Sequence, residues 1–156
     1  MVVRNFTVDI DNLEITVDRV INSSAANVFK DYTDPALIPK WWGEESVKTS
    51  VELQNLDEGG SWRFIQTEPN GTTYAWSGIY QEIIQSSKIV STFVFEPSPG
   101  HPYIGTALFT DLPNGTTSLV EKIKFLNVED LHGMLSMDME QKTAERLDRF
   151  ASVAEN

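Results

Sequence analysis

The stretch SWRFIQTEPNGTTYAWSGIYQEI, residues 61–83, places two runs of alternating side chains on either side of an Asn-Gly pair. Asn-Gly between such runs is the strongest short-range signal for a β-hairpin, because both residues tolerate positive φ. Side chains alternate between the two faces of a strand, so the hairpin should gather four aromatic residues on one face: Trp62, Phe64, Trp76 and Tyr80. A second PNG triplet at residues 113–115 predicts a second hairpin in the same way.

Strands account for much of the remaining sequence. Residues 47–125 consist of alternating runs joined by short turns, which is typical of a meander of antiparallel hairpins. Residues 13–21 alternate in the same way and predict one earlier strand. The sequence has neither a βαβ rhythm nor a glycine-rich phosphate loop, which argues against a nucleotide-binding doubly wound sheet.

Two short helices are predicted after the first strand. Ser23 or Ser24 is a suitable N-cap for the first of them. The second is expected to begin at Pro35 with Asp34 as its cap, because proline suits the first helical position. Pro39 should then limit this helix, since the residue before a proline avoids the α region.

One long helix is predicted at the end of the chain. From about Glu129 to Val153, apolar residues recur every three or four positions. The elements together predict an α+β protein, with a single domain over residues 1–156. In it, a curved antiparallel sheet of about six or seven strands wraps around the long C-terminal helix. Such a sheet rarely fills its own interior, so a cavity is expected between sheet and helix.

Composition narrows the function classes. Lys and Arg number 12 against 23 Asp and Glu, and the net charge of -11 disfavours nucleic acid and anionic membranes as partners. The absence of cysteine excludes disulfides, thiolate catalysis and Cys-ligated metals. The N-terminal segment lacks the apolar run of a signal peptide, and no stretch is long enough to cross a bilayer. We therefore expect a soluble cytoplasmic protein without a cofactor.

Several segments resemble a known family. The words DRVINSSAANVFKDYTDPALIPKWWG, EGGSWRF, SGIYQEI, SKIVSTF and ERLDRF, in this order and spacing, are similar to the bacterial activator of heat-shock-protein-90 ATPase homologue-like (AHSA-type) family. That family belongs to the START-related, birch-pollen-allergen-like helix-grip superfamily, often called SRPBCC. The resemblance covers roughly residues 13–152 and implies a helix-grip fold.

The resemblance also assigns individual positions. Members typically carry an Arg in the first strand, a TDP…WW segment, a Gly-Gly turn and a G-x-aromatic-x-E-I strand. The matching residues are Arg19; Thr33, Asp34, Pro35, Trp41 and Trp42; Gly59 and Gly60; and Gly78, Tyr80, Glu82 and Ile83. Members also tend to show Gly-Met and Gly-Trp pairs early in the long helix. This chain keeps Met139 there but has Asp138, Lys142 and Thr143 in the other places, so a helix face that usually helps line the cavity is altered.

The candidate ligand-binding residues are mainly aromatic or apolar: Trp42, Trp62, Phe64, Trp76, Tyr80, Phe93, Leu135 and Met139. Apolar walls with a few polar groups are typical of small-molecule pockets, and indole and phenol groups can orient a ligand. The alternative is that these residues only pack the core. For the adjacent Trp41 and Trp42, one interpretation has one ring anchoring the short helices and the other bordering the cavity mouth. In the other interpretation, both plug the end of the sheet.

Charged and histidine residues add weaker candidates. An arginine in the cavity would suit a carboxylate or carbonyl, although solvent-facing or edge placement is the commoner outcome for Arg19 and Arg63. His101 and His132 are far apart in sequence and have no third ligand at a recognisable spacing, so no metal site is predicted.

Three functions remain open. The favoured one is a binding module for a small hydrophobic or amphipathic molecule, lipid-like or polyketide-like. The second is a cavity-based enzyme of cyclase or hydrolase type, for which Tyr80, Glu82 or His101 could supply an acid or base, although no catalytic constellation is visible. The third, suggested by the family title, is a co-chaperone-like stress-response protein that acts through its surface. Edge strands can pair between chains, so either a monomer or a homodimer is expected.

Overall fold

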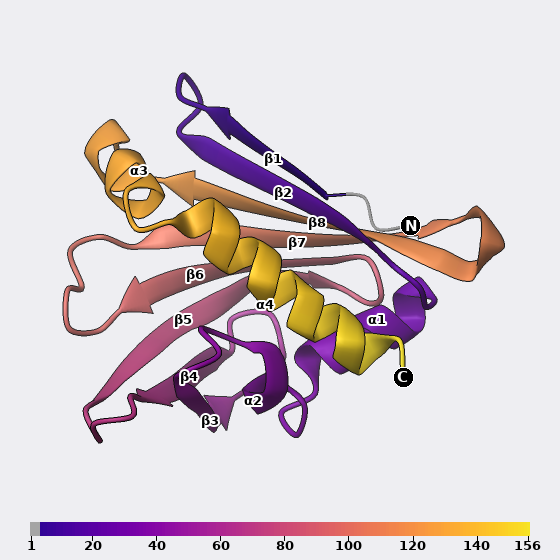
Figure 1. The fold of residues 1–156 in the computed structure, drawn as a ribbon, viewed down its shortest axis with the longest axis horizontal. Coiled ribbons are helices and arrows are strands. Elements are labelled where there is room, and N and C mark those ends of the chain that lie inside the picture. The colour runs from indigo at the N-terminus through magenta and orange to yellow at the C-terminus, as the bar shows by residue number, and fades with distance from the viewer. Residues whose placement is uncertain (1–3) are drawn as a thin grey trace.

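The computed structural model describes residues 4–156 and has one antiparallel sheet of eight strands (Figure 1). The strands are β1 (Arg4–Asp9), β2 (Glu14–Ile21), β3 (Lys48–Gln54), β4 (Ser61–Thr67), β5 (Thr73–Ile84), β6 (Lys88–Phe95), β7 (Tyr103–Leu112) and β8 (Thr116–Phe125). Their order across the sheet is β1-β2-β8-β7-β6-β5-β4-β3. The predicted meander from β3 to β8 is therefore confirmed, and β8 closes it against β2.

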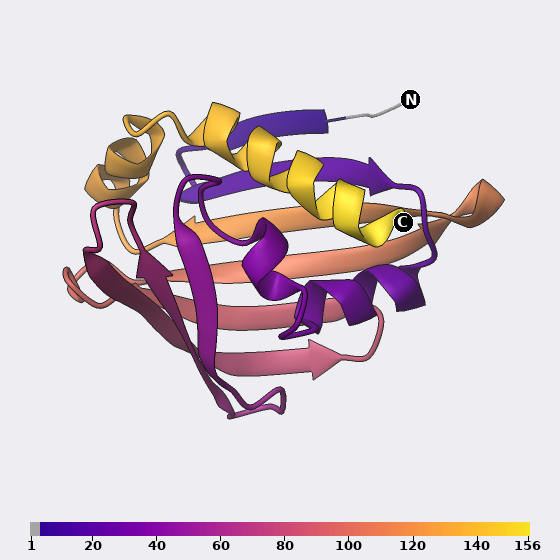
Figure 2. The ribbon, with the colours of Figure 1, turned by 60° about the horizontal axis from the view of Figure 1, so that its bottom comes forward.

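Four α-helices accompany the sheet: α1 (Ala25–Thr33), α2 (Ile38–Trp41), α3 (Val128–Leu135) and α4 (Met139–Ala154). Figure 2 shows that α4 crosses the concave side of the curved sheet and that α1 and α2 lie beside its C-terminal half. The α+β helix-grip prediction is confirmed, with a slightly higher strand count than the expected six or seven. No helix within residues 4–156 is long and apolar enough to span a membrane.

The additional strand is β1, a short strand in which only Phe6 and Val8 alternate with polar residues. It pairs with β2 at one edge of the sheet, and Asn5, Thr7 and Val8 are all exposed. Alternation in the sequence indicates a strand most clearly when one face of the strand is buried, and neither face of β1 is fully buried. As a result, the two short helices follow the second strand rather than the first.

The prediction of one long C-terminal helix is wrong in its continuity. The segment forms α3 and α4, separated by residues 136–138. Asp138 adopts a left-handed conformation with φ 59°, which aspartate tolerates better than most residues. The hydroxyl of Ser136 donates to the carbonyl of Gly133 at 2.7 Å and helps to end α3. Apolar periodicity continues across this break because both helices cover the same side of the sheet.

The second short helix also differs from the prediction. Residues 35–37 form a turn, in which the Asp34 carboxylate accepts from the N–H of Ala36 at 2.9 Å. The helix itself is α2, and Pro39 lies in its first turn instead of limiting it. Proline is tolerated there because the N–H groups of a first turn have no intrahelical partner.

Both Asn-Gly hairpins are confirmed. The first joins β4 to β5, and Gly71 has φ 89°. The second joins β7 to β8, and both Asn114 and Gly115 have positive φ. Because these turns fix the strand register, they also decide which side chains face α4.

Side chains on the concave face form the core. The buried positions alternate along β2, β4 and β8, as expected for strands with one covered face. A main cluster includes Val28, Trp41 and Leu147, whereas a smaller cluster at the α3 end includes Leu131 and Phe125. Of the aromatic residues described next, Trp62 and Phe64 belong to the main cluster, whereas Tyr103 packs against the smaller one.

Candidate binding site

A continuous set of rings covers the concave face of β4 to β7 and is here called the aromatic wall: Trp42, Trp62, Phe64, Trp76, Phe93 and Tyr103. Trp42 lies edge-on to Phe64, with ring centroids 5.1 Å apart. Phe93 stacks on Tyr103 at 5.0 Å, with an angle of 7° between the ring planes. The wall therefore connects the segment after α2 to β7.

Two glycines make room for the rings. The register places Trp62 opposite Gly78, and a Cβ at Gly78 would lie 2.7 Å from the Trp62 indole nitrogen. A Cβ at Gly105 would lie 2.5 Å from the Phe93 ring. The large side chains can lie flat across neighbouring strands because these two positions have no side chains.

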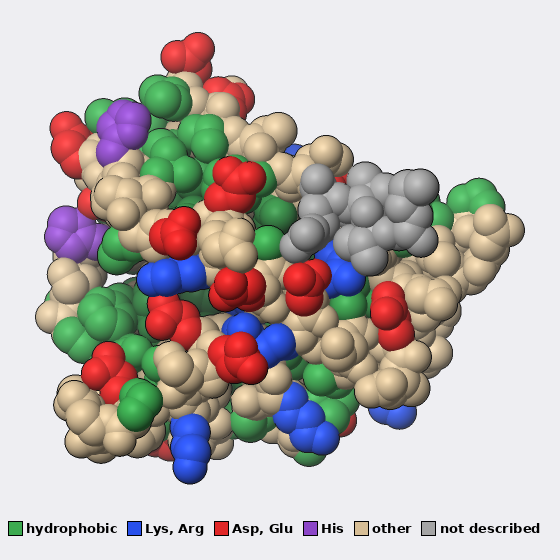
Figure 3. All heavy atoms as spheres, viewed as in Figure 1, with side chains coloured by type: hydrophobic (Ala, Val, Ile, Leu, Met, Phe, Trp, Pro, Cys, Tyr) green, Lys and Arg blue, Asp and Glu red, His purple; other side chains and the backbone are tan. Residues whose placement is uncertain are grey.

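Four rings of the wall remain partly accessible: Trp42, Trp76, Phe93 and Tyr103. Figure 3 shows a hollow beside the N-terminal half of α4, over β5 and β6, with hydrophobic side chains on its floor and charged side chains at its border. A fully packed interface between helix and sheet would leave such rings inaccessible. The wall therefore faces space that α4 does not fill.

The two adjacent tryptophans have different surroundings. Trp41 is only 2% exposed and packs against Tyr32 and Phe150, with ring centroids 4.8 and 4.9 Å away. Trp42 is partly exposed and belongs to the aromatic wall, where it contacts Trp76. Trp41 thus anchors the short helices, and Trp42 contributes a ring to the hollow side.

A buried ion pair joins α4 to the middle of the sheet. Arg146 on α4 donates to both carboxylate oxygens of Glu121 on β8, at 2.5 and 3.2 Å. The Tyr32 hydroxyl donates to the same carboxylate at 2.6 Å, and the guanidinium lies 5.9 Å from the centre of the Trp41 ring. The Arg146 and Glu121 side chains keep 20% and 11% of their surface accessible. This residual access means that the interior beneath α4 is not fully closed at the pair.

Burial and charge shift the pKa values of this group in a consistent way. Burial alone would raise the pKa of Glu121, but the charge of Arg146 and the hydrogen bonds from Arg146 and Tyr32 outweigh it, and the net pKa is lowered. Burial raises the pKa of both Tyr32 and Tyr103. At neutral pH the cluster therefore contains one carboxylate, one guanidinium and two protonated phenols.

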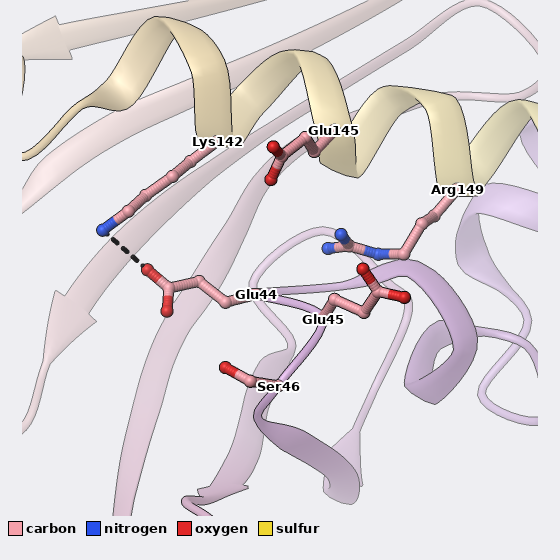
Figure 4. A pocket seen from close by; sticks show the side chains of 6 residues that line it. All are labelled: Glu44, Glu45, Ser46, Lys142, Glu145 and Arg149. Atoms are coloured by element: carbon pink, nitrogen blue, oxygen red, sulfur yellow. Dashed lines mark ion pairs between the residues drawn. The ribbon is translucent and has the colours of Figure 1, made fainter.

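The outer border of this region contains a cleft of about 350 Å³, lined by Glu44, Glu45, Ser46, Lys142, Glu145 and Arg149. Figure 4 shows Lys142 reaching from α4 to Glu44 in the loop after α2, and their charged atoms are 2.8 Å apart. Arg149 donates to the carbonyl of Trp41 at the end of α2 and to that of Gly43 in the same loop. The loop is thus held to α4 at two points two helical turns apart.

The structure brings five of the eight candidate residues together in the aromatic wall: Trp42, Trp62, Phe64, Trp76 and Phe93. Tyr80 is buried on the same face, where its hydroxyl accepts from Gln54 at 3.3 Å. Leu135 and Met139 belong to the smaller cluster near α3. Tyr103 and Phe125 connect that cluster to the wall, with ring centroids 5.9 Å apart.

The two candidate arginines have different environments. Arg19 is only 6% exposed, so the solvent-facing placement expected for it is wrong; it donates to the carbonyl of Leu147 and pairs with Asp148, both at 2.8 Å. Arg63 faces the opposite side of the sheet from Trp62, and its side chain is 36% exposed. It forms two hydrogen bonds with Glu96 at 2.8 and 2.9 Å beside a second cleft of about 340 Å³. Neither arginine belongs to the aromatic wall.

The weak acid–base candidates are not brought together. A bulge between Tyr80 and Glu82 moves Glu82 to the other face of β5, where it pairs with Lys88 at 2.6 Å. His101 is exposed and lies 2.7 Å from Asp130 on α3. Within residues 4–156, no group of three or more His, Asp or Glu side chains could hold a metal ion.

Sequence reasoning missed the polar cluster of Tyr32, Tyr103, Glu121 and Arg146. Glu121 stands at a buried position of an alternating strand, and Arg146 lies about one turn from each of the buried residues Thr143 and Phe150 on the inner face of α4. A charged residue at an expected core position is a signal for a buried pair, because such a charge must be compensated. The sequence alone could have indicated that Glu121 is buried, but it could not have identified Arg146 as its partner.

Solved structures of similar fold cover nearly the whole chain. Protein Ms6760 from Mycobacterium smegmatis is 20% identical with a TM-score of 0.82, covering 98% of this chain and 97% of that one. A protein from Arthrobacter aurescens is 18% identical with a TM-score of 0.87, covering 96% and 90%. An AHSA1 protein from Silicibacter pomeroyi is 18% identical with a TM-score of 0.71, covering 89% and 95%. These identities are low, so the likeness shows the fold alone.

Sequence comparison identifies the family. No curated protein matches this chain. The family model described as Activator of Hsp90 ATPase homolog 1-like protein matches residues 22–155, from the end of β2 to the end of α4. The matched range includes the aromatic wall and the Glu121–Arg146 pair. The chain therefore belongs to the family of Activator of Hsp90 ATPase homolog 1-like proteins.

Proposed function

We propose that this chain binds a small amphipathic molecule between the concave face of the sheet and α4. The observation that carries the proposal is the partial accessibility of Trp42, Trp76 and Phe93, although α4 crosses the same face. Burying an apolar side chain is favourable by about 1.5–3 kcal/mol. Rings that stay accessible beneath a helix therefore favour an apolar ligand as their packing partner.

The polar cluster supports an amphipathic ligand rather than a purely apolar one. Tyr103 belongs to the aromatic wall and also lies within the electrostatic influence of Arg146 and Glu121. A molecule whose apolar body contacts the wall could direct a polar group to these residues. Small-molecule sites commonly combine apolar walls with a few oriented polar groups. Family membership agrees with a ligand-binding fold in general and leaves the ligand unspecified.

Native mass spectrometry of freshly purified protein, compared with its denatured mass, tests this function. We expect a reproducible excess mass of small-molecule size that is released on denaturation. Trp76→Ala should lose the excess mass because it removes a ring from the wall. Ile79→Ala is the matched control, since Ile79 lies on the same strand but is 41% exposed on the other face. An excess mass that persists in Trp76→Ala, or that Ile79→Ala removes equally, would contradict binding at the wall.

A further inference from the structure

We propose that the polar group of the ligand is uncharged, a hydroxyl or a carbonyl rather than a carboxylate or a phosphate. This inference rests on the proposed function, because it specifies the ligand of the same site. It follows from the charge balance beneath α4, where Arg146, whose charge acts on Tyr103 of the wall, is already paired with Glu121.

Arg146 is neutralised by Glu121 before any ligand arrives. Its two terminal nitrogens donate to the two carboxylate oxygens, at 2.5 and 3.2 Å. An anionic ligand that approached Arg146 would also approach the charge of Glu121 in a medium of low dielectric constant. Like charges repel strongly there, and an unpaired buried anion is costly. The pair therefore disfavours an anionic group instead of attracting one.

The other cations of α4 have partners as well. Lys142 pairs with Glu44 at 2.8 Å, and Arg149 donates to the backbone carbonyls of Trp41 and Gly43. The cleft at the border also contains more carboxylates than cations, as Figure 4 illustrates. With a net charge of -11 for the chain, the electrostatic field around the site favours neutral ligands over anions.

Hydrogen-bonding capacity for an uncharged group remains. The Glu121 carboxylate offers about four acceptor sites, and Arg146 and Tyr32 occupy three of them. The phenol of Tyr103 is a protonated donor that has no hydrogen-bond partner among residues 4–156. A hydroxyl could accept from Tyr103 and donate to Glu121, and a carbonyl could accept from Tyr103.

Three probes with the same aromatic body separate these cases: naphthalene, 2-naphthol and 2-naphthoate. At neutral pH they carry no polar group, a neutral hydroxyl and an anionic carboxylate respectively. Isothermal titration calorimetry of the wild-type chain should give the tightest binding for 2-naphthol. We expect 2-naphthoate to bind about tenfold or more weakly, because its charge must be desolvated beside Glu121. Equal or tighter binding of 2-naphthoate would overturn the inference.

Two variants test the roles of the individual groups. Glu121→Gln leaves the Arg146 charge without its counter-ion, so 2-naphthoate should gain about tenfold in affinity. Tyr103→Phe removes only the hydroxyl and should weaken 2-naphthol several-fold while leaving naphthalene unchanged. If Glu121→Gln does not fold, the wild-type series and Tyr103→Phe still decide the matter. An unchanged 2-naphthol affinity in Tyr103→Phe would also count against the inference.

Failure of the inference is distinguishable from failure of the proposed function. Naphthalene reports on the aromatic wall alone, so an absence of binding by all three probes would contradict the proposed function itself. Binding of naphthalene with a preference for 2-naphthoate would leave the proposed function intact and refute only the uncharged polar group.

Discussion

Arg146 on α4 and Glu121 on β8 form a two-point ion pair in the middle of the interface between helix and sheet. The pair occupies a position where the apolar pattern of both elements would predict a hydrophobic contact. Buried ion pairs often contribute little net stability compared with apolar residues of similar size. The stability of the fold alone therefore does not explain their presence at this position, which agrees with the proposed role in ligand binding.

Removing one member of the pair should destabilise the protein strongly. Arg146→Met is expected to lower the free energy of unfolding by about 3–5 kcal/mol, because the charge of Glu121 stays buried without a counter-ion. Urea denaturation followed by circular dichroism measures this loss. The double variant Glu121→Leu/Arg146→Met should recover most of it, since no buried charge remains.

Arg63→Met is the matched control for that prediction. Arg63 also forms ion pairs, with Glu52 and Glu96, but these lie at the surface. Exposed pairs contribute little because water and salt screen them. Similar losses for Arg63→Met and Arg146→Met would contradict the buried character of the Glu121 pair.

The same ion pair predicts that the free energy of unfolding falls at acidic pH. The pKa of Glu121 is lowered in the folded state below its ordinary value of 4.5, so its stabilising contribution is present above that pH. The contribution should be lost as the pH falls through the folded pKa. Denaturation of wild type and Glu121→Gln at several pH values measures the effect as a difference in unfolding free energy that shrinks in acid. A difference that is constant from neutral pH into acid would contradict the assignment.

Alkaline pH should lower the stability of the fold because the tyrosines ionise. Burial is the first cause of the raised pKa at all four tyrosines: Tyr32, Tyr74, Tyr80 and Tyr103. A raised pKa in the folded state means that this contribution to stability is present below the ordinary pKa of 10.0 and declines as the pH rises. Tyrosinate absorbance should therefore increase together with loss of near-ultraviolet circular dichroism. Complete ionisation near the ordinary pKa in a chain that stays folded would refute the partial burial of Tyr32 and Tyr103.

The backbone beneath Trp62 allows a further prediction. A Cβ at Gly78 would lie 1.8 Å from the carbonyl oxygen of Thr92, and a backbone atom cannot give way easily. Gly78→Ala should therefore cost about 1–3 kcal/mol of stability, as overpacking usually does, and should weaken probe binding at the wall. Gly100→Ala is the control, because no atom lies within 4 Å of the added methyl group. Thermal unfolding of both variants gives the comparison, and equal midpoints would contradict the close approach at Gly78.

Local sequence patterns predicted many of the strands and turns of this fold. Features that depend on contacts between distant segments, or on a single irregular residue, were not predicted. Alternation around the Asn-Gly pair correctly gathered Trp62, Phe64 and Trp76, because strand period and hairpin register are local properties. The bulge after Tyr80 was not predictable from alternation, and it moved Glu82 away from the site. The break at Asp138 was hidden for a similar reason: a single left-handed residue does not interrupt apolar periodicity.

The polar half of the site was the least predictable part. Tyr32, Glu121 and Arg146 come from α1, β8 and α4, which are far apart in sequence and meet through contacts in the folded chain. A sequence pattern can indicate that a charge such as Glu121 is buried, but the identity of its partner depends on tertiary packing. The aromatic half, in contrast, comes mainly from neighbouring strands in a meander.

The most direct test of the central claim is a titration of ¹⁵N-labelled protein with 2-naphthol, followed by the four indole N–H signals of Trp41, Trp42, Trp62 and Trp76. We predict saturable shifts of the Trp42, Trp62 and Trp76 signals, with a much smaller shift of Trp41, which is packed against Phe150. Unchanged indole signals, or shifts confined to the opposite face around Arg63 and Ile79, would contradict a ligand site between the sheet and α4.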